Sequence, residues 1–415
     1  MERQLALEIL LKFKQEQSYL NLTINHYFQR YSLTRQQKDL ITRIVYGTVQ
    51  NMLLLEYILK PHLHMRVKAF EKMLLLMSLY QHEMMDAIPD YAIINEAVEL
   101  AKKKKGMKTS RFIHGVLQNV FQSSYQLDDL PPLERLSIET SHPLWLVKML
   151  NKQYGDKETK RICHAFLEVP RHCARVNTLL ISREELLKDN HWQKADLSPD
   201  GLYYTGHHIA SSEAFQKGYV TVQDESSQLV ARLLNPSKQD YVLDMCCAPG
   251  SKTTHLAMLM NNQGCIEAYD LYEHKIHLVE KQLTRLHVQN VKTHVGDSTT
   301  LMQVYPQETF DKILCDAPCS GLGVLARKPE IKYHDSSSMD EIMVIQEKLL
   351  ENAYFLLKKG GNIVYSTCTI NKKENEKQIE KFITKYPDMK KRKEVTILPY
   401  QYHSDGFYMC LLEKE

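Results

Sequence analysis

The feature that most constrains the fold is a regular alternation of short apolar segments and amphipathic segments in the second half of the chain. Apolar segments of strand length recur at residues 241–244, 265–270, 291–295, 310–316 and 361–366. Segments with helical periodicity lie between several of them, including a long one at 341–359. This alternation predicts a parallel, doubly wound sheet of the α/β class. Two later segments, near 395–398 and 407–412, predict an added antiparallel hairpin.

The front of the chain has a different pattern, with apolar residues at helical spacing throughout. It predicts an all-helical domain at residues 1–135. Within it, we expect Asp90 to cap the start of one helix and Ser110 to open the next.

The middle of the chain mixes short helical and strand-like patterns. Ser182 and Glu185 have the spacing of a capping box, and nearby runs of Leu, Tyr and Val read as strands. These patterns predict a small α+β domain at residues 136–222. The α/β domain then occupies residues 223–415.

Positive charge is concentrated in the helical front domain, although the whole chain has a net charge of only +3. Four consecutive lysines, Lys102 to Lys105, are followed by Lys108 and Arg111. Such a cluster is either a solvated loop between helices or a surface that binds phosphates. The second interpretation gains weight only if the rest of the chain indicates a nucleic-acid substrate.

Composition excludes several other classes of protein. Nine cysteines are spread along the chain without a C-x-x-C pair or a Cys/His set at zinc spacing, so we expect no metal site. No apolar run approaches the roughly 18 residues of a membrane-spanning helix. The first residues do not have the pattern of a signal peptide. We therefore expect a monomeric, cytoplasmic protein without a membrane partner.

Chemically capable residues follow the predicted strands, where ligands bind in open parallel sheets. Asp244 ends the first strand and leads into a turn of small residues, which is neither a G-x-G-x-x-G motif nor a P-loop. Asp270, after the second strand, is placed to bind the hydroxyls of a ribose, and Asp297, after the third, to accept a bond from an adenine amino group. The predicted cofactor-binding residues of the turn are Cys246, Cys247, Ala248, Pro249, Gly250, Ser251 and Lys252.

Two thiols follow the fourth and fifth strands. The fourth ends in Asp316-Ala-Pro-Cys319, and the fifth runs into Ser366-Thr-Cys368. Neighbouring strands lie about 4.8 Å apart. If these two strands are neighbours, Cys319 and Cys368 face one crevice beside the cofactor.

Five motifs in this part of the chain resemble those of the S-adenosylmethionine-dependent RNA cytosine-C5 methyltransferases. They lie at residues 222–228, 246–252, 316–320, 327–330 and 367–369. Ser251, Cys247 and Thr369 depart from the family's usual residues, and all three are small. Residues 91–103 and 111–117 resemble the NusB family of helical RNA-binding proteins. Together, these resemblances imply a Rossmann-like class I methyltransferase domain behind an all-α NusB-like domain.

The resemblance also implies an activity and the roles of three residues. The donor is S-adenosylmethionine, and the partner is 16S ribosomal RNA, naked or in an early assembly particle, with cytosine 967 as the target. Cys368 is the nucleophile that adds to C6 of the base. Asp316 binds the base and takes part in the cofactor site, and Cys319 assists loss of the C5 proton and release of the enzyme.

Two other functions compete with this interpretation. Asp316-Ala-Pro-Cys319 could be a degenerate amino-methyltransferase motif, but position 319 is not aromatic and Cys368 is present. The chain could also be a non-enzymatic RNA-binding or ribosome-assembly protein. The intact acidic residues and both thiols count against that alternative.

Overall fold

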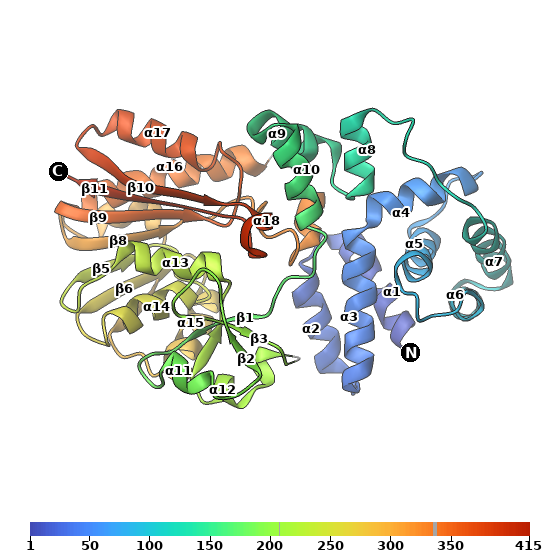
Figure 1. Ribbon diagram of the computed structural model, residues 1–415, viewed down its shortest axis with the longest axis horizontal. Coiled ribbons are helices and arrows are strands. Elements are labelled where there is room, and N and C mark those ends of the chain that lie inside the picture. The colour runs from blue at the N-terminus through green and yellow to red at the C-terminus, as the bar shows by residue number, and fades with distance from the viewer. Residues whose placement is uncertain (207, 335–337) are drawn as a thin grey trace. The chain divides into compact units, whose positions relative to one another are not determined.

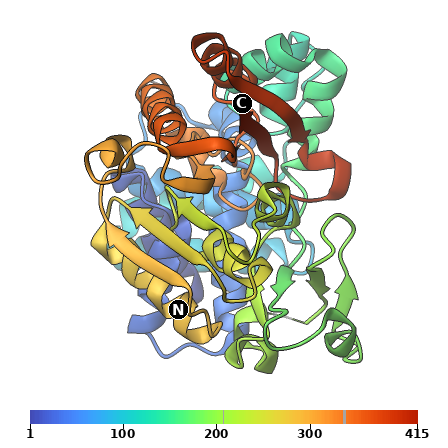
Figure 2. The same ribbon diagram turned by 90° about the vertical axis from the view of Figure 1, so that its left-hand side faces the viewer.

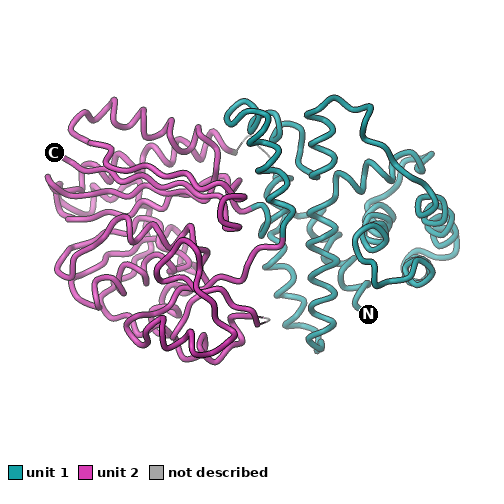
Figure 3. The backbone as a smooth tube through the Cα atoms, viewed as in Figure 1, with its two compact units in different colours: residues 1–168, 325–334 teal, residues 169–324, 335–415 magenta. Residues whose placement is uncertain are grey.

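The computed structural model describes residues 1–206, 208–334 and 338–415, and the chain forms two compact units (Figures 1 and 3). Unit 1 comprises Met1–Glu168 and Leu325–His334, and unit 2 comprises Val169–Val324 and Asp335–Glu415. Among the described residues, none of the helices combines the length and the apolar composition needed to cross a bilayer.

Unit 1 is helical, as the spacing of its apolar residues predicts. Its α-helices are α1 (Glu2–Glu16), α2 (Leu20–Arg30), α3 (Arg35–Gln50), α4 (Met52–Leu59), α5 (Ala69–Met84), α6 (Asp90–Lys105), α7 (Met107–Phe121), α8 (Pro132–Glu139), α9 (Leu144–Tyr154) and α10 (Asp156–Ala165). Helix α5 is the central one, because every residue from Met73 to Gln81 is buried. It packs against α1, α3, α4, α6 and α7, which explains why its apolar residues are not confined to one face.

Two predicted helix starts in unit 1 are wrong. Helix α6 begins at Asp90 itself, with Pro89 as its N-cap, so Asp90 lies in the first turn. Helix α7 begins at Met107 rather than Ser110. Gly106 ends α6 with a φ of 88°, which allows α7 to start at the next residue. Ser110 then lies inside α7, where its hydroxyl donates to the Val98 carbonyl across the two helices (3.1 Å).

A segment from the second half of the chain is part of unit 1. Residues Leu325–His334, which contain the short 3-10 helix η4 (Pro329–Tyr333), pack among the helices. Glu330 accepts a bond from the backbone N–H of Leu20 (3.1 Å), and the Lys332 amine donates to the carbonyl of Gln50 (2.7 Å). Both charged side chains are fully buried. This segment, which carries the motif at 327–330, is therefore held by the helical unit.

Unit 2 contains a small four-stranded antiparallel sheet, as expected for an α+β region. Its strand order is β2-β3-β1-β4. The strands are β1 (Cys173–Val176), β2 (Trp192–Lys194), β3 (Gly201–Tyr204) and β4 (Val220–Val222), and the short helices are α11 (Arg183–Leu186), η2 (Ile209–Ser211) and α12 (Glu213–Gln216). Ser182 caps α11 by accepting from the N–H of Glu185, which is half of the predicted capping box, while the Glu185 carboxylate accepts from Lys188 instead.

The rest of unit 2 is built on a seven-stranded sheet with the order β10-β11-β9-β8-β5-β6-β7 (Figures 1 and 2). Strands β5 to β9 are parallel, and β11 is antiparallel to both of its neighbours. The strands are β5 (Tyr241–Asp244), β6 (Cys265–Asp270), β7 (Val291–Val295), β8 (Phe310–Asp316), β9 (Leu357–Thr367), β10 (Met389–Ile397) and β11 (Phe407–Lys414). The predicted parallel sheet with an added hairpin is confirmed.

Helices cover both faces of this sheet. Helices α16 (Ser338–Leu356) and α17 (Glu376–Lys385) enclose one apolar core, and α13 (Glu225–Leu234) and α14 (Ser251–Leu259) enclose the other. Helix α15 (Glu273–Arg285), the 3-10 helix η3 (Ser298–Gln303) and α18 (Pro399–Tyr402) complete the unit. The helix predicted at 341–359 ends at Leu356, because Leu357 already belongs to β9 and pairs with Phe310 of β8.

The strand order reverses between β5 and β8. The chain moves outward from β5 to β6 and β7, then returns to place β8 on the other side of β5. Such a reversal leaves a crevice outside the carboxyl ends of the two strands, which is where open α/β sheets bind their ligands.

Candidate active site

The two thiols singled out in the sequence meet at this edge of the sheet. Strands β8 and β9 are neighbours, and the Sγ atoms of Cys319 and Cys368 lie 3.3 Å apart. Both side chains are half-buried. The hydrogen bond with Cys368 and burial both raise the pKa of Cys319 well above that of a free thiol. Cys319 is thus held in the protonated form.

Asp316, at the end of β8, lies beside a half-buried amine. Its Oδ2 accepts from the Nζ of Lys252 (2.6 Å), and its Oδ1 accepts from the Ser366 hydroxyl (2.7 Å). Burial favours the neutral amine of Lys252, but the charge and hydrogen bond of Asp316, together with the nearby Cys368 and Asp244, outweigh it and raise the pKa of Lys252. The crevice therefore contains a protonated amine paired with the Asp316 carboxylate.

The turn after β5 packs closely against α15. Gly250 has a φ of 102°, and a Cβ there would lie 3.3 Å from the Cα of Val279. Its N–H donates to the carbonyl of Cys247 (2.7 Å), and α14 begins at the next residue. The Cys247 thiol packs in the core with Ile276 and Val279, and its backbone N–H donates to the carbonyl of Tyr269 (2.8 Å).

Asp244, just before this turn, was not predicted as a site residue. It is fully buried, and its Oδ2 accepts from the hydroxyl of Thr253 in α14 (2.7 Å). Burial raises its pKa to about 7, and the nearby charge of Asp316 adds to the shift. The hydrogen bond ties the end of β5 to the first turn of the helix and so fixes the turn between them.

The other two predicted acids lie at the ends of their strands and also stabilise local turns. Asp270 is 8% exposed, accepts from the N–H of Tyr272 (3.2 Å) and pairs with Lys275 (3.6 Å). Asp297 is exposed and caps η3 by accepting from the N–H and the hydroxyl of Thr299 (2.9 and 2.7 Å). In both residues these contacts use Oδ1.

A buried carboxylate that was not predicted joins the two thiol loops. Glu374 is 0% exposed. It accepts from the N–H and hydroxyl of Ser320 (2.8 and 2.5 Å), from the Asn371 amide (3.0 Å) and from the Gln346 amide (3.2 Å). Ser320 follows Cys319 directly, whereas Glu374 lies six residues after Cys368. One side chain thus holds the loop of each cysteine in register with the other.

Two further contacts fix the backbone around Cys368. Asn375 accepts from the Thr367 hydroxyl (2.5 Å) and donates to the carbonyl of Thr369 (2.9 Å), so it binds the residues on both sides of the cysteine. The N–H of Gly323 donates to the carbonyl of Cys368 itself (3.0 Å). A Cβ at Gly323 would lie 1.9 Å from the carbonyl oxygen of Gly406, so this approach requires glycine. In the sequence, the signal for these contacts is the group of Asn and Glu residues that follows Cys368, namely Asn371, Glu374 and Asn375.

Known proteins match the chain in three consecutive segments. They are the NusB family at residues 1–122, the ferredoxin-like domain of RsmF/B-like methyltransferases at 142–206, and the 16S rRNA methyltransferase RsmB/F family at 231–413. A Bacillus subtilis (strain 168) protein named "Probable ribosomal RNA small subunit methyltransferase B" is 39% identical over 443 residues, covering 100% of this chain and 98% of that protein. The chain belongs to the RsmB/F family of 16S rRNA methyltransferases.

Other members of the RsmB/F family are also similar over nearly the full length. A protein of the same printed name from Synechocystis is 32% identical over 99% of both chains. Ribosomal RNA small subunit methyltransferase B of Proteus mirabilis is 31% identical over 92% of both. This membership confirms the predicted enzyme class, an rRNA cytosine-C5 methyltransferase, and the predicted NusB-like front domain. It decides against the amino-methyltransferase and the non-enzymatic alternatives.

Solved structures share the fold of this chain. The crystal structure of PH0851 has the same fold over 100% of this chain, with a TM-score of 0.85 at 24% identity and 99% of that chain covered. NSun6 from Pyrococcus horikoshii, solved with SFG, matches 66% of this chain and 98% of its own, with a TM-score of 0.61 at 25% identity.

Proposed function

We propose that this RsmB/F-family enzyme transfers a methyl group from S-adenosylmethionine to C5 of a cytosine in 16S rRNA, at cytosine 967, through a covalent adduct. One observation carries the mechanism. Two thiols lie 3.3 Å apart at the carboxyl ends of adjacent parallel strands, beside the Lys252–Asp316 pair.

The turn at Cys246–Lys252 fits the cofactor chemically. It is a turn of small residues that leads directly into α14, and the acids Asp270 and Asp297 follow the next two strands. We assign the ribose hydroxyls to Asp270 and the adenine amino group to Asp297. Backbone groups of Cys246, Cys247, Ala248, Pro249, Gly250, Ser251 and Lys252, with Asp316 nearby, complete the proposed site. When bound, S-adenosylmethionine supplies an electrophilic methyl group.

Cys368 is the proposed nucleophile. C5 of cytosine reacts poorly by itself, and addition of a thiolate at C6 turns C5 into a nucleophilic enamine carbon. The raised pKa keeps Cys319 protonated, while the Lys252 amine favours the thiolate of Cys368. This difference supports attack by Cys368 rather than by Cys319.

Asp316 and Cys319 have complementary roles in the proposal. Asp316, oriented by Lys252 and Ser366, accepts a hydrogen bond from the amino group of the base, and from N3 once that nitrogen has taken a proton from solvent as the thiolate adds. After C5 has bonded to the methyl group, its proton must leave so that the C6–S bond can break. Cys319 assists this step: after its own proton has passed to solvent, its thiolate takes the C5 proton, the C–H electrons form the C5=C6 double bond, and the C6–S bond breaks to release the Cys368 thiolate. The raised pKa of Cys319 makes that thiolate a strong base. The target base must leave its stack to reach these groups.

The same proposal includes the partner and the domains. The NusB-like domain at 1–135 contributes RNA affinity, the small domain at 136–222 follows it, and residues 223–415 carry the chemistry. We infer that the enzyme acts in the cytoplasm as a monomer, on naked 16S rRNA or an early assembly particle.

Bisulfite sequencing of 16S rRNA tests the activity, the base and the position together. RNA from cells that contain the protein should resist conversion at one cytosine, and RNA from cells that lack it should not. Complementation with the intact gene should restore the protection, whereas complementation with Cys368→Ala should not. Protection that persists without the gene would refute the proposal.

A further inference from the structure

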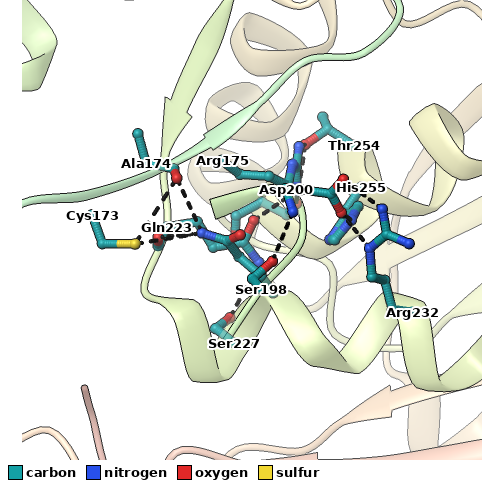
Figure 4. Close-up of polar contacts among 12 residues, drawn as sticks. Cys173, Ala174, Arg175, Ser198, Asp200, Gln223, Ser227, Arg232, Thr254 and His255 are labelled. Atoms are coloured by element: carbon teal, nitrogen blue, oxygen red, sulfur yellow. Dashed lines mark hydrogen bonds and ion pairs between the residues drawn. The ribbon is translucent and has the colours of Figure 1, made fainter. Parts of the chain in front are cut away.

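A buried guanidinium lies directly beneath the turn that follows β5. Arg175 is on β1 of the small sheet and is 1% exposed. Its Nη1 donates to Gln223 Oε1 (2.7 Å) and to the carbonyl of Ser251 (2.5 Å), and its Nη2 donates to the hydroxyl of Thr254 (3.0 Å) (Figure 4). One side chain of the small domain thus binds the first turn of α14.

The charge of Arg175 is costly to bury at this place. Burial lowers its pKa to about 9, so it remains a cation at neutral pH, and Asp200 is the carboxylate that favours the charged form. Asp200, however, is bound by Arg232 and by the Nε2 of His255 (3.0 Å) (Figure 4). The hydrogen bonds of Arg175 go to neutral oxygens. An apolar side chain would fill such a space at lower cost, which points to a role for the bonds themselves.

Those bonds continue into the proposed donor site. The Thr254 hydroxyl, which accepts from Arg175, lies 2.8 Å from the carbonyl oxygen of Gly250 and 3.1 Å from that of Ser251. Arg175 and Thr254 therefore hold the two peptide groups that precede Lys252. The orientation of those peptide groups sets the direction of the N–H groups of the turn. It also sets the direction in which the Lys252 side chain leaves the backbone to reach Asp316.

We propose that Arg175 is a positioning residue for methyl-donor binding, acting through Thr254 and the carbonyls of Gly250 and Ser251. The small domain then supplies part of the support of the donor site, in addition to any contact with RNA. This inference rests on the proposed binding of S-adenosylmethionine at the turn.

The chain offers a matched control for the attachment of the small domain. Arg285, on α15, donates to the carbonyls of Phe215 and Val220 (2.8 and 2.9 Å) and to the Thr221 hydroxyl (3.1 Å). It joins the same two parts of unit 2 as Arg175 does, but none of these bonds involves the turn. Loss of Arg285 loosens the attachment and leaves the donor turn supported.

Calorimetric titration of S-adenosylmethionine into four full-length variants tests the proposal. Arg175→Lys keeps the positive charge but loses the two guanidinium nitrogens that bind Ser251 and Thr254. Thr254→Val removes the hydroxyl that links Arg175 to the carbonyls of Gly250 and Ser251, with little change in side-chain shape. Each should weaken donor binding about tenfold and raise the KM for the donor more than it lowers kcat. Arg285→Gln should leave the donor Kd within about twofold. Asp270→Ala, a residue of the proposed site itself, should weaken binding at least tenfold.

The pattern of results separates the alternatives. Equal weakening by Arg285→Gln and Arg175→Lys would show that Arg175 only attaches the small domain and would overturn the inference. Normal donor binding by Thr254→Val, with weakening by Asp270→Ala, would also overturn it, and this variant decides the matter if Arg175→Lys does not fold. Normal binding by Asp270→Ala would instead refute the proposed donor site on which the inference rests.

Discussion

The Sγ of Cys319 lies 3.3 Å from the Sγ of Cys368, and each cysteine follows one of two adjacent parallel strands. The two thiols share a hydrogen bond, so they are not chemically equivalent. The hydrogen bond with Cys368 and burial raise the pKa of Cys319. This relationship makes the order of the covalent steps testable.

Replacing each thiol in turn should give opposite results. Without Cys319, attack and methyl transfer still occur but release stalls, so Cys319→Ala should yield a protein–RNA adduct that resists denaturant. Without Cys368 no adduct forms, and the double variant should behave like Cys368→Ala. A denaturing gel with labelled substrate RNA reads the outcome. An adduct in Cys368→Ala and none in Cys319→Ala would assign the attack to Cys319.

Asp270→Ala should weaken S-adenosylmethionine binding at least tenfold, measured by calorimetry. The proposed grip on two ribose hydroxyls consists of charge-assisted hydrogen bonds, each worth about 1.5–3 kcal/mol. Lys275→Ala is the matched control, because it removes the ion pair of Asp270 but not the grip. Equal loss in both variants would mean that the ion pair, rather than the ribose contact, matters.

Glu374→Gln should lower kcat at least tenfold while the affinity for S-adenosylmethionine stays within about twofold. The variant replaces the charge-assisted hydrogen bonds from Ser320, Asn371 and Gln346 with weaker neutral ones. The new side-chain NH2 group would also face a group that donates to Glu374 in the native protein. The thiols then lose their relative placement, but the donor turn is untouched. Single-turnover methyl transfer and calorimetry measure the two effects. A loss of donor affinity equal to the loss in kcat would indicate general unfolding instead.

The basic cluster of unit 1 should contribute salt-dependent RNA affinity. Lys103, Lys108 and Arg111 are exposed at the end of α6 and on α7. Replacing all three with Ala should weaken RNA binding and reduce the slope of log K against log salt by about 0.7–0.9 for each phosphate that is no longer neutralised. Replacing Lys391, Arg392 and Lys393 on β10 removes the same charge and is the control. An unchanged slope in the first variant would identify the cluster as a solvated surface.

His255 should make stability depend on pH. Burial, with the charge of Arg175, lowers its pKa from 6.5 to about 3. Between these values the unfolded chain binds a proton that the folded protein does not, so stability falls as the pH drops below about 6.5, by about 1.4 kcal/mol per unit. Urea unfolding should therefore show a loss of about 2 kcal/mol from this group between about pH 7 and pH 5. The loss should shrink in His255→Gln, and identical pH dependence in both proteins would contradict the assignment.

The sequence predicted the sheet and the proximity of Cys319 and Cys368 because both follow from the positions of the apolar strand segments. Strands β6, β7 and β8 begin and end at the predicted residues, and adjacency of β8 and β9 places Cys319 beside Cys368. Glu374 and Arg175 were not predicted. Each is a charged residue buried by partners far along the chain, Ser320 and Ser251, and no periodicity records such contacts. The wrong start at Ser110 has a local cause, the tight junction at Gly106.

The segment Leu325–His334 decides how the chain can be cut or truncated. The chain passes from one unit to the other three times, after residues 168, 324 and 334. A single proteolytic cut or an early truncation therefore cannot release the helical unit intact. A fragment that begins at residue 169 would carry Glu330 and Lys332 without the backbone groups of Leu20 and Gln50 that bind them. The helical unit therefore cannot be cut from the chain in one piece, and any insertion between Cys319 and Leu325 would lengthen the link between Cys319 and the helices.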